Sequence, residues 1–181
     1  MSNWIKQLDE LDRQLGDLFA EAGKYDNARL LQQPGPGRWS AIQVMQHLML
    51  SEGGSLQYLR KKTSSGVSGI GKTGFSATFR KWLLKAYLAL PFKFKAPKVV
   101  AEESFPPVSG LEEVRSNWLK IRSDLRAFMG ALPQEAHTRE VYRHPIAGRM
   151  DISGMFDFFQ SHFSRHRQQI ERTLKEVGSR D

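Results

Sequence analysis

Apolar residues recur at spacings of three and four along most of the chain, which is the period of an amphipathic α-helix. Long segments of this kind lie near residues 5–22, 41–60, 111–132 and 151–177. The first carries its apolar side chains at Ile5, Leu8, Leu11, Leu15, Leu18, Phe19 and Ala22. No segment alternates with the period of a strand, although "REVYRHP" is compatible with a short extended piece. We therefore predict an all-α protein.

Local signals mark the ends of two of these helices. Ser40 followed by Gln43 predicts a capping box, in which each side chain satisfies a backbone N–H left open by the first helical turn. Ser109 followed by Glu112 predicts a second capping box, and Pro133 stops the helix that follows it. The spacing thus predicts helices that begin close to residues 41 and 110.

A long connection, from Thr63 to Val108, separates the second of these helices from the third. It is rich in glycine and serine at first and then carries a shorter amphipathic pattern, through Phe75, Phe79, Trp82, Leu83 and Ala86. A crossover of this length is typical of a four-helix bundle that is not simply up and down. With 181 residues and 40% apolar content, we expect one domain over residues 1–181.

Composition narrows the class of protein. There is no cysteine, so the chain has no thiolate ligand or cysteine nucleophile, and we expect a cytoplasmic protein. The longest apolar run, "WLLKAYLAL", is too short to span a bilayer. The net charge is +8, with a basic stretch in "FRKWLLKAYLALPFKFKAPK". This stretch is either a solvated face or, in a non-catalytic binding module, a surface for nucleic acid or an anionic membrane.

The stretch "GVSGIGKT", from Gly66 to Thr73, matches the phosphate-binding pattern G-x-x-x-x-G-K-[ST]. That pattern requires an apolar strand before the glycine loop and a helix N-terminus after it. The preceding "QYLRKKTSS" is polar, basic and helical in character. We interpret the stretch as a loop of the crossover, with nucleotide binding at Gly66 to Thr73 as a minor alternative.

Two histidines of "FFQSHFSRHRQQI" lie four residues apart, so His162 and His166 share one face of the last helix. They continue the apolar sequence of that helix and take positions where a bundle core should have Leu or Phe. Buried imidazoles need a hydrogen-bond partner or a metal ion. His47 on the second helix can also reach the interior, and three histidines would form a metal site with an open coordination position.

These residues lead to a resemblance. The segments "GRWSAIQVMQHL" and "RHPIAGRMDISGMFDFFQSHFSRHRQQI", together with the "PP" before the third helix, are similar to the DinB/YfiT-like superfamily over nearly the whole chain. The resemblance implies a four-helix bundle with a divalent metal on His47, His162 and His166. With three nitrogen ligands, we expect this metal to be zinc or nickel. The resemblance also implies a metal-dependent enzyme acting on a small molecule, as in family members that are thiol-dependent S-transferases or hydrolases.

Other residues are candidates for support of this site. Gln43 and Gln169 lie one turn from His47 and His166 and can hold a ligand's distal N–H. His144 stands at the family's "HP" turn, where we expect a structural or supporting role, and His137 is expected to be solvated. A homodimer is left open, and specific binding of nucleic acid is not expected.

The acidic residues bear on the reaction. A hydrolase normally places a carboxylate near the metal as general base. Asp157 and Glu52 each lie five positions from a histidine, about 140° around the helix. This favours an S-transferase that takes a low-molecular-weight thiol as co-substrate, with a metal-dependent hydrolase as the alternative.

Overall fold

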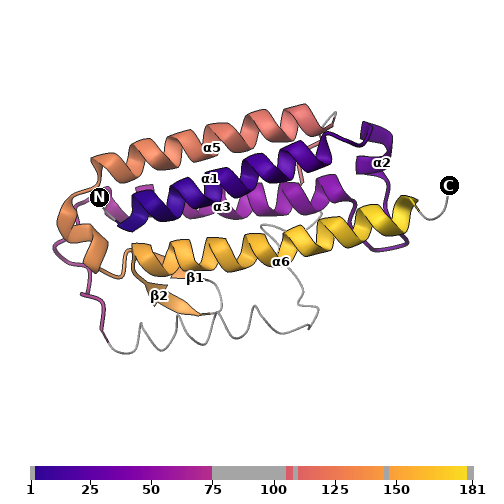
Figure 1. Cartoon of the computed structure of the whole chain (residues 1–181). Helices are drawn as coiled ribbons and strands as arrows, with labels where there is room; N and C mark the ends of the chain where they lie inside the picture. Colours follow the sequence, from indigo (N-terminus) through magenta and orange to yellow (C-terminus); the bar gives the residue numbers. More distant parts are fainter. Residues whose placement is uncertain (1–2, 75–104, 108–109, 145–146, 179–181) are drawn as a thin grey trace.

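The computed structural model describes residues 3–74, 105–107, 110–144 and 147–178 (Figure 1). Its helices are α1 (Asn3–Ala22), α2 (Asn27–Leu31), α3 (Ala41–Thr63), α5 (Leu111–Ala131) and α6 (Ile152–Gly178), with the 3-10 helix η3 (Gln134–Thr138) and strands β1 (Tyr142–His144) and β2 (Gly148–Met150). The four predicted long helices are therefore present. The short amphipathic helix and the basic stretch predicted for the crossover lie outside the described residues.

The long helices pack side by side as a bundle, with α3 against both α5 and α6, and α1 against α6 and α5 (Figure 1). The apolar faces predicted from the spacing line its interior. The largest fully buried side chains include Trp118, Phe156, Phe159, Phe163, Leu8, Leu11 and Leu15. The predicted all-α four-helix bundle is confirmed, and its core positions the inward faces of α3 and α6 toward each other.

The start of α3 follows the sequence signal. Ser40 Oγ accepts a hydrogen bond from the backbone N–H of Gln43 at 3.2 Å, and the Ser40 N–H donates to Gln43 Oε1 at 2.8 Å. At the start of α6, Asp151 Oδ1 accepts from the Gly154 N–H at 2.8 Å. Both caps fix where the helices that carry the candidate histidines begin.

The start of α5 differs from the prediction. Ser109 lies outside the described residues, and Gly110 is the N-cap, with no side-chain cap of its own. The Leu111 N–H instead donates to Asn27 Oδ1 of α2 at 3.0 Å. A Cβ at residue 110 would lie 2.4 Å from that oxygen, so only glycine admits the approach. The cap comes from a distant part of the chain, which a local pattern cannot reveal.

A small hairpin precedes α6 and was only half expected. "REVYRHP" supplies β1, as the extended pattern suggested, but its antiparallel partner β2 was not predicted. Tyr142 of β1 is buried, and its hydroxyl lies 3.1 Å from Ser55 Oγ of α3. The hairpin packs against α3 and α6 and lies close to the first half of α6 (Figure 1).

The described surroundings of the glycine stretch 66–73 differ from those of a phosphate-binding loop. Helix α3, not a strand, leads into it, and its amides serve internal bonds: Ile70 N–H donates to Val67 O at 3.0 Å, and Thr73 N–H to Thr138 O at 2.9 Å. Arg139 adds a bond to the Ile70 carbonyl at 2.6 Å. Amides engaged in this way do not converge on a phosphate.

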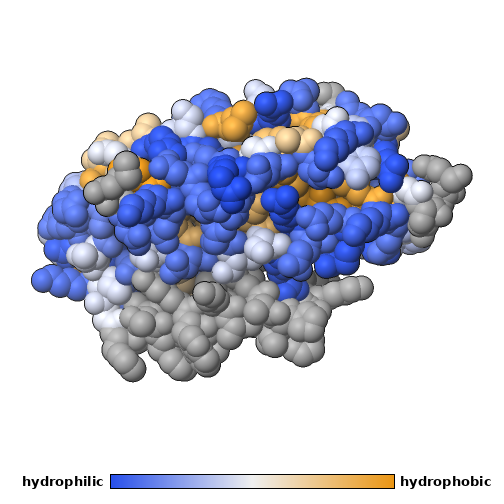
Figure 2. All heavy atoms as spheres, viewed as in Figure 1, coloured by the Kyte–Doolittle hydropathy of each residue, from blue (hydrophilic) through white to orange (hydrophobic). Residues whose placement is uncertain are grey.

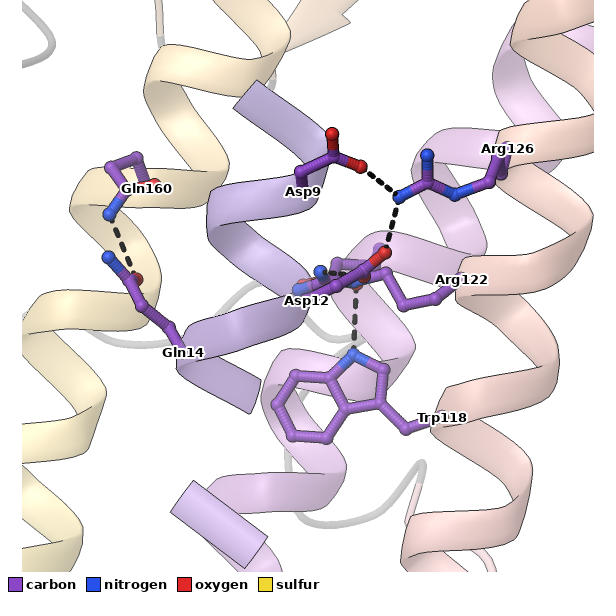
Figure 3. A network of polar contacts seen from close by, with 8 residues as sticks. Asp9, Asp12, Gln14, Trp118, Arg122, Arg126 and Gln160 are labelled. Atoms are coloured by element: carbon purple, nitrogen blue, oxygen red, sulfur yellow. Dashed lines mark hydrogen bonds and ion pairs between the residues drawn. The ribbon is translucent and has the colours of Figure 1, made fainter. Parts of the chain in front are cut away.

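Buried charges join α1, α3 and α5. Arg122, 3% exposed, donates to both carboxylate oxygens of Glu52 and to Asp12 Oδ1, the last at 2.9 Å. The Trp118 indole donates to Glu52 Oε2 at 2.9 Å. Arg126 reaches Asp12 and Asp9, each at 2.7 Å, as Figure 3 shows. We call these residues the charge network.

The face of the bundle in Figure 2 is mostly hydrophilic, with hydrophobic residues visible in patches among polar ones. The large hydrophobic side chains that are exposed in the described part of the chain are Leu31, 41% exposed, and Leu119, 48% exposed. No helix in the described ranges combines the length and hydropathy needed to cross a membrane.

Candidate metal centre

Helices α3 and α6 bring three histidines together in the bundle interior. His47 and His162 are 5% and 9% exposed, and His166 is half-buried on the same face of α6. The Nε2 atoms of His47 and His162 are 3.1 Å apart, and one ligand nitrogen from each of the three lies within 4.8 Å of the others. Residues 115 positions apart in the chain thus meet at one point.

The donor set fits a divalent metal ion. Zinc–nitrogen bonds of 2.0–2.1 Å in a tetrahedral site place two ligand nitrogens about 3.3 Å apart. The 3.1 Å between the His47 and His162 Nε2 atoms is close to that separation. Among the histidines and acids of the described ranges, these three residues form the group whose spacing suits a metal ion. The group contains no carboxylate. Three nitrogen ligands would leave room for a further ligand.

Burial keeps the imidazoles of His162 and His166 in the neutral form that binds metals. It lowers the pKa of His162 well below 6.5, and the neighbouring imidazoles of His166 and His47 lower it further. Burial also lowers the pKa of His166 to about 3, although its bond to Gln169 opposes the shift. A neutral imidazole offers one nitrogen lone pair, so both residues are ready to coordinate at neutral pH.

The candidate supporting residues take different places. His166 Nδ1 lies 2.9 Å from Gln169 Oε1, which leaves Nε2 as the ring nitrogen that can bind a metal. Gln43 Oε1 accepts from the Ser40 N–H in the capping box and from Gln33 Nε2, so its described contacts lie at the start of α3. His144, on β1, is buried and accepts a bond from the Ala147 N–H through Nδ1 at 3.1 Å.

Aromatic side chains border the histidines. The Trp39 ring lies 5.2 Å from the His47 ring and 5.2 Å from that of Phe105, and the Phe158 ring stacks on His162 at 4.9 Å. Gln46 Nε2 donates to the Pro106 carbonyl at 2.6 Å, which fastens the segment 105–107 to α3. The sequence reasoning did not assign Phe158 to the site, although its place one turn before His162 was a usable signal.

The acids considered as general bases have other contacts. Glu52 is engaged by Arg122 and Trp118 in the charge network. Asp157 Oδ1 accepts from Gln7 Nε2 of α1 at 3.1 Å. His137, expected to be solvated, is half-buried, and its ring stacks near Trp4 at 6.4 Å. The site therefore consists of imidazoles and aromatic rings in the described part of the chain.

Comparison with known proteins gives one family. The model of the DinB superfamily matches residues 10–170, which is nearly the whole chain. No curated protein and no solved structure matches the sequence.

Proposed function

The chain belongs to the DinB superfamily, and from this membership and its histidine cluster we propose that it is a metal-dependent enzyme. Its metal, zinc or nickel, is held by His47, His162 and His166. Its reaction is the transfer of a low-molecular-weight thiol to a small electrophilic substrate. The observation that carries the proposal is the convergence of three imidazoles from α3 and α6, with one ligand nitrogen from each within 4.8 Å of the others.

Each residue has a defined task in this proposal. The three histidines contribute nitrogen lone pairs, and burial keeps His162 and His166 unprotonated at neutral pH. Gln169 accepts the Nδ1 proton of His166 and so leaves Nε2 for coordination. The Trp39 ring, which packs against Phe105, borders His47 with apolar surface and limits the approach of bulk water. A bound divalent ion supplies Lewis acidity that lowers the pKa of a coordinated thiol or water.

Thiol transfer agrees with the residues present better than hydrolysis does. The chain has no cysteine, so the sulfur comes from a co-substrate. In the transfer, sulfur bonds to the electrophilic carbon, the leaving group departs with the electron pair of its bond, and the thiol proton is released. A hydrolase needs a base that takes a proton from water, and Glu52, the buried acid of α3, is instead engaged by Arg122.

The first test is metal content. Protein purified without a metal-affinity column is analysed for bound elements, before and after incubation with zinc or nickel. We expect about one ion per chain, close to none in His162→Ala, and the parental content in His137→Ala, because His137 lies against Trp4. A parent protein that takes up neither metal at neutral pH contradicts the proposal.

The second test separates the two reactions. The metal-loaded protein is offered a chromogenic electrophile with each of several small thiols, and an activated ester without thiol. Turnover that requires a thiol and disappears in His162→Ala supports the S-transferase. Thiol-independent ester cleavage that disappears in the same variant replaces it with a hydrolase.

A further inference from the structure

The structure orients two of the three imidazoles by different means. The Nδ1 of His166 is held by Gln169 at 2.9 Å. His162 makes one hydrogen bond to a described residue, and it uses Nε2, the atom nearest His47. That atom would be taken by a metal ion. No polar partner of the described chain therefore remains to fix the plane of the His162 ring in the metal-bound form.

An aromatic ring packs against the face of the His162 imidazole. Phe158 stands one helical turn before His162 on α6, so the two side chains share a face. Their centroids are 4.9 Å apart, with an interplanar angle of 19°. Stacking at this distance restricts rotation of the imidazole about its Cβ–Cγ bond, because a turned ring would strike the face of Phe158. Phe158 is itself 7% exposed and has little room to move.

The hairpin holds Phe158 in turn. The His144 ring of β1 meets it edge to face, with centroids 4.5 Å apart and planes at 67°. The Ala147 N–H donates to His144 Nδ1 at 3.1 Å, which fixes the orientation of this ring. A chain of contacts thus runs from the hairpin through Phe158 to His162.

We propose that Phe158, braced by His144, is a positioning residue that sets the ring plane of His162 for metal binding. The proposal rests on the function proposed above. It assigns to an aromatic stack the task that Gln169 performs for His166 through a hydrogen bond. Loss of a group that orients a metal ligand commonly lowers metal affinity by 10- to 100-fold. A stack is less directional than a hydrogen bond, so we expect about a tenfold loss.

The test compares two phenylalanines of α6. Phe158→Leu removes the stack but keeps an apolar side chain. Phe156→Leu is the matched control, because Phe156 is 1% exposed and its described ring contact is to Phe159. Co²⁺ and Zn²⁺ affinities are measured by competition with a chromophoric chelator, and the visible absorption of the Co²⁺ form reports the geometry of its ligands.

We expect Phe158→Leu to bind about tenfold more weakly and to change the Co²⁺ spectrum, on the scale set by other orienting residues. Phe156→Leu should lose thermal stability but keep the parental affinity and spectrum. A purely structural role for Phe158 would lower stability in both variants and leave the metal readouts unchanged. That outcome overturns the inference while the proposed function stands. A parent that binds neither ion overturns both.

A third variant keeps the inference testable if Phe158→Leu does not fold. His144→Asn preserves an acceptor for the Ala147 N–H and removes the ring edge that contacts Phe158. We expect a smaller loss of Co²⁺ affinity, about threefold, because the effect passes through one intermediate ring. If the folded His144→Asn protein keeps the parental Co²⁺ affinity and spectrum, His144 does not brace Phe158. If Phe158→Leu also fails to fold, that same result overturns the inference.

Discussion

Helix α3 carries a buried acid and a buried imidazole five positions apart, and their surroundings differ. Glu52 meets Arg122 and the Trp118 indole, so its charge and its hydrogen-bonding capacity are matched by other residues of the chain. His47 meets two further imidazoles and no acid in the described cluster. The charge network is complete in itself, whereas the histidine cluster gathers electron pairs that an external cation could use.

This difference matters for how buried polar groups are interpreted. A buried ion pair is costly to break but says little about function, because its desolvation and its attraction nearly cancel. Three imidazoles gathered at one point, with no carboxylate in the described cluster, are instead a donor set suited to a metal ion. The two regions share one helix, so variants and conditions that affect them separately can test the distinction.

Acid should produce the largest effect, and it acts first on the histidine cluster. Burial lowers the pKa of His144 to about 4 and that of His166 to about 3, and the pKa of His162 is also well below 6.5. As the pH of metal-free protein falls through 6.5, the unfolded chain takes up protons that the folded protein does not. Its free energy of unfolding should fall by about 1.4 kcal/mol per pH unit for each histidine.

The loss should be steepest from pH 6.5 to about 4, where His144 begins to protonate in the folded protein, and should continue to about 3 through His166. Urea unfolding of the metal-free protein at several pH values measures it. His166→Gln should make the free energy of unfolding depend less steeply on pH, because one histidine fewer takes up a proton on unfolding. A free energy of unfolding that stays constant across this window would contradict the neutral, buried state of the cluster.

Breaking the charge network should cost stability without changing metal binding. Arg122→Met leaves the Glu52 carboxylate buried without its cation, which typically costs about 3–5 kcal/mol. Adding Glu52→Gln should recover much of that loss, since no buried charge then remains unpaired. Urea unfolding gives the free energies, and chelator competition gives the zinc affinity.

A surface ion pair is the control for this prediction. Arg13 pairs with Glu10 on α1, and their side chains are 61% and 44% exposed. Arg13→Met should leave the free energy of unfolding nearly unchanged, because solvent screens an exposed ion pair. A tenfold fall in zinc affinity in a folded Arg122→Met protein would show that the two regions are not separate.

The smallest effects concern two adjacent glycines of α3. A Cβ at Gly54 would meet no atom within 4 Å, so Gly54→Ala should raise the free energy of unfolding by up to about 1 kcal/mol. A Cβ at Gly53 would lie 3.2 Å from Ile121 Cδ1 of α5, so Gly53→Ala should gain less. Thermal and urea unfolding of both variants measure the difference. Equal gains in the free energy of unfolding would mean that the Ile121 side chain moves aside for the new methyl group at little cost.

What the sequence predicted depended on local geometry. The spacing of His162 and His166 fixes a shared face on α6, and the Ser40–Gln43 pair fixes where α3 begins. Each needs only residues within one or two turns. The contact of His47 with His162 and His166 depends on tertiary packing. It could still be predicted, because the apolar patterns of α3 and α6 placed all three histidines toward the same interior.

What the sequence did not predict depends on partners far along the chain. Glu52 and Arg122 are 70 positions apart, and neither side chain alone indicates that it is buried. Asn27 caps α5 from 84 positions away, so the local Ser–Glu pattern indicated the wrong N-cap residue. The contact of His144 with Phe158 requires the β1–β2 hairpin, whose short strands lack a clear periodic pattern.

The meeting of His47 and His162 also has a kinetic side. A cation held by both residues would close a loop of 115 positions, and it could do so only after α3 and α6 had come together. Refolding rates should then be the same with and without the ion, because the slow search for this long-range contact precedes binding. The ion would act afterwards, by slowing the separation of the two helices. Metal loading would therefore lengthen the lifetime of the folded chain without shortening the time needed to reach it.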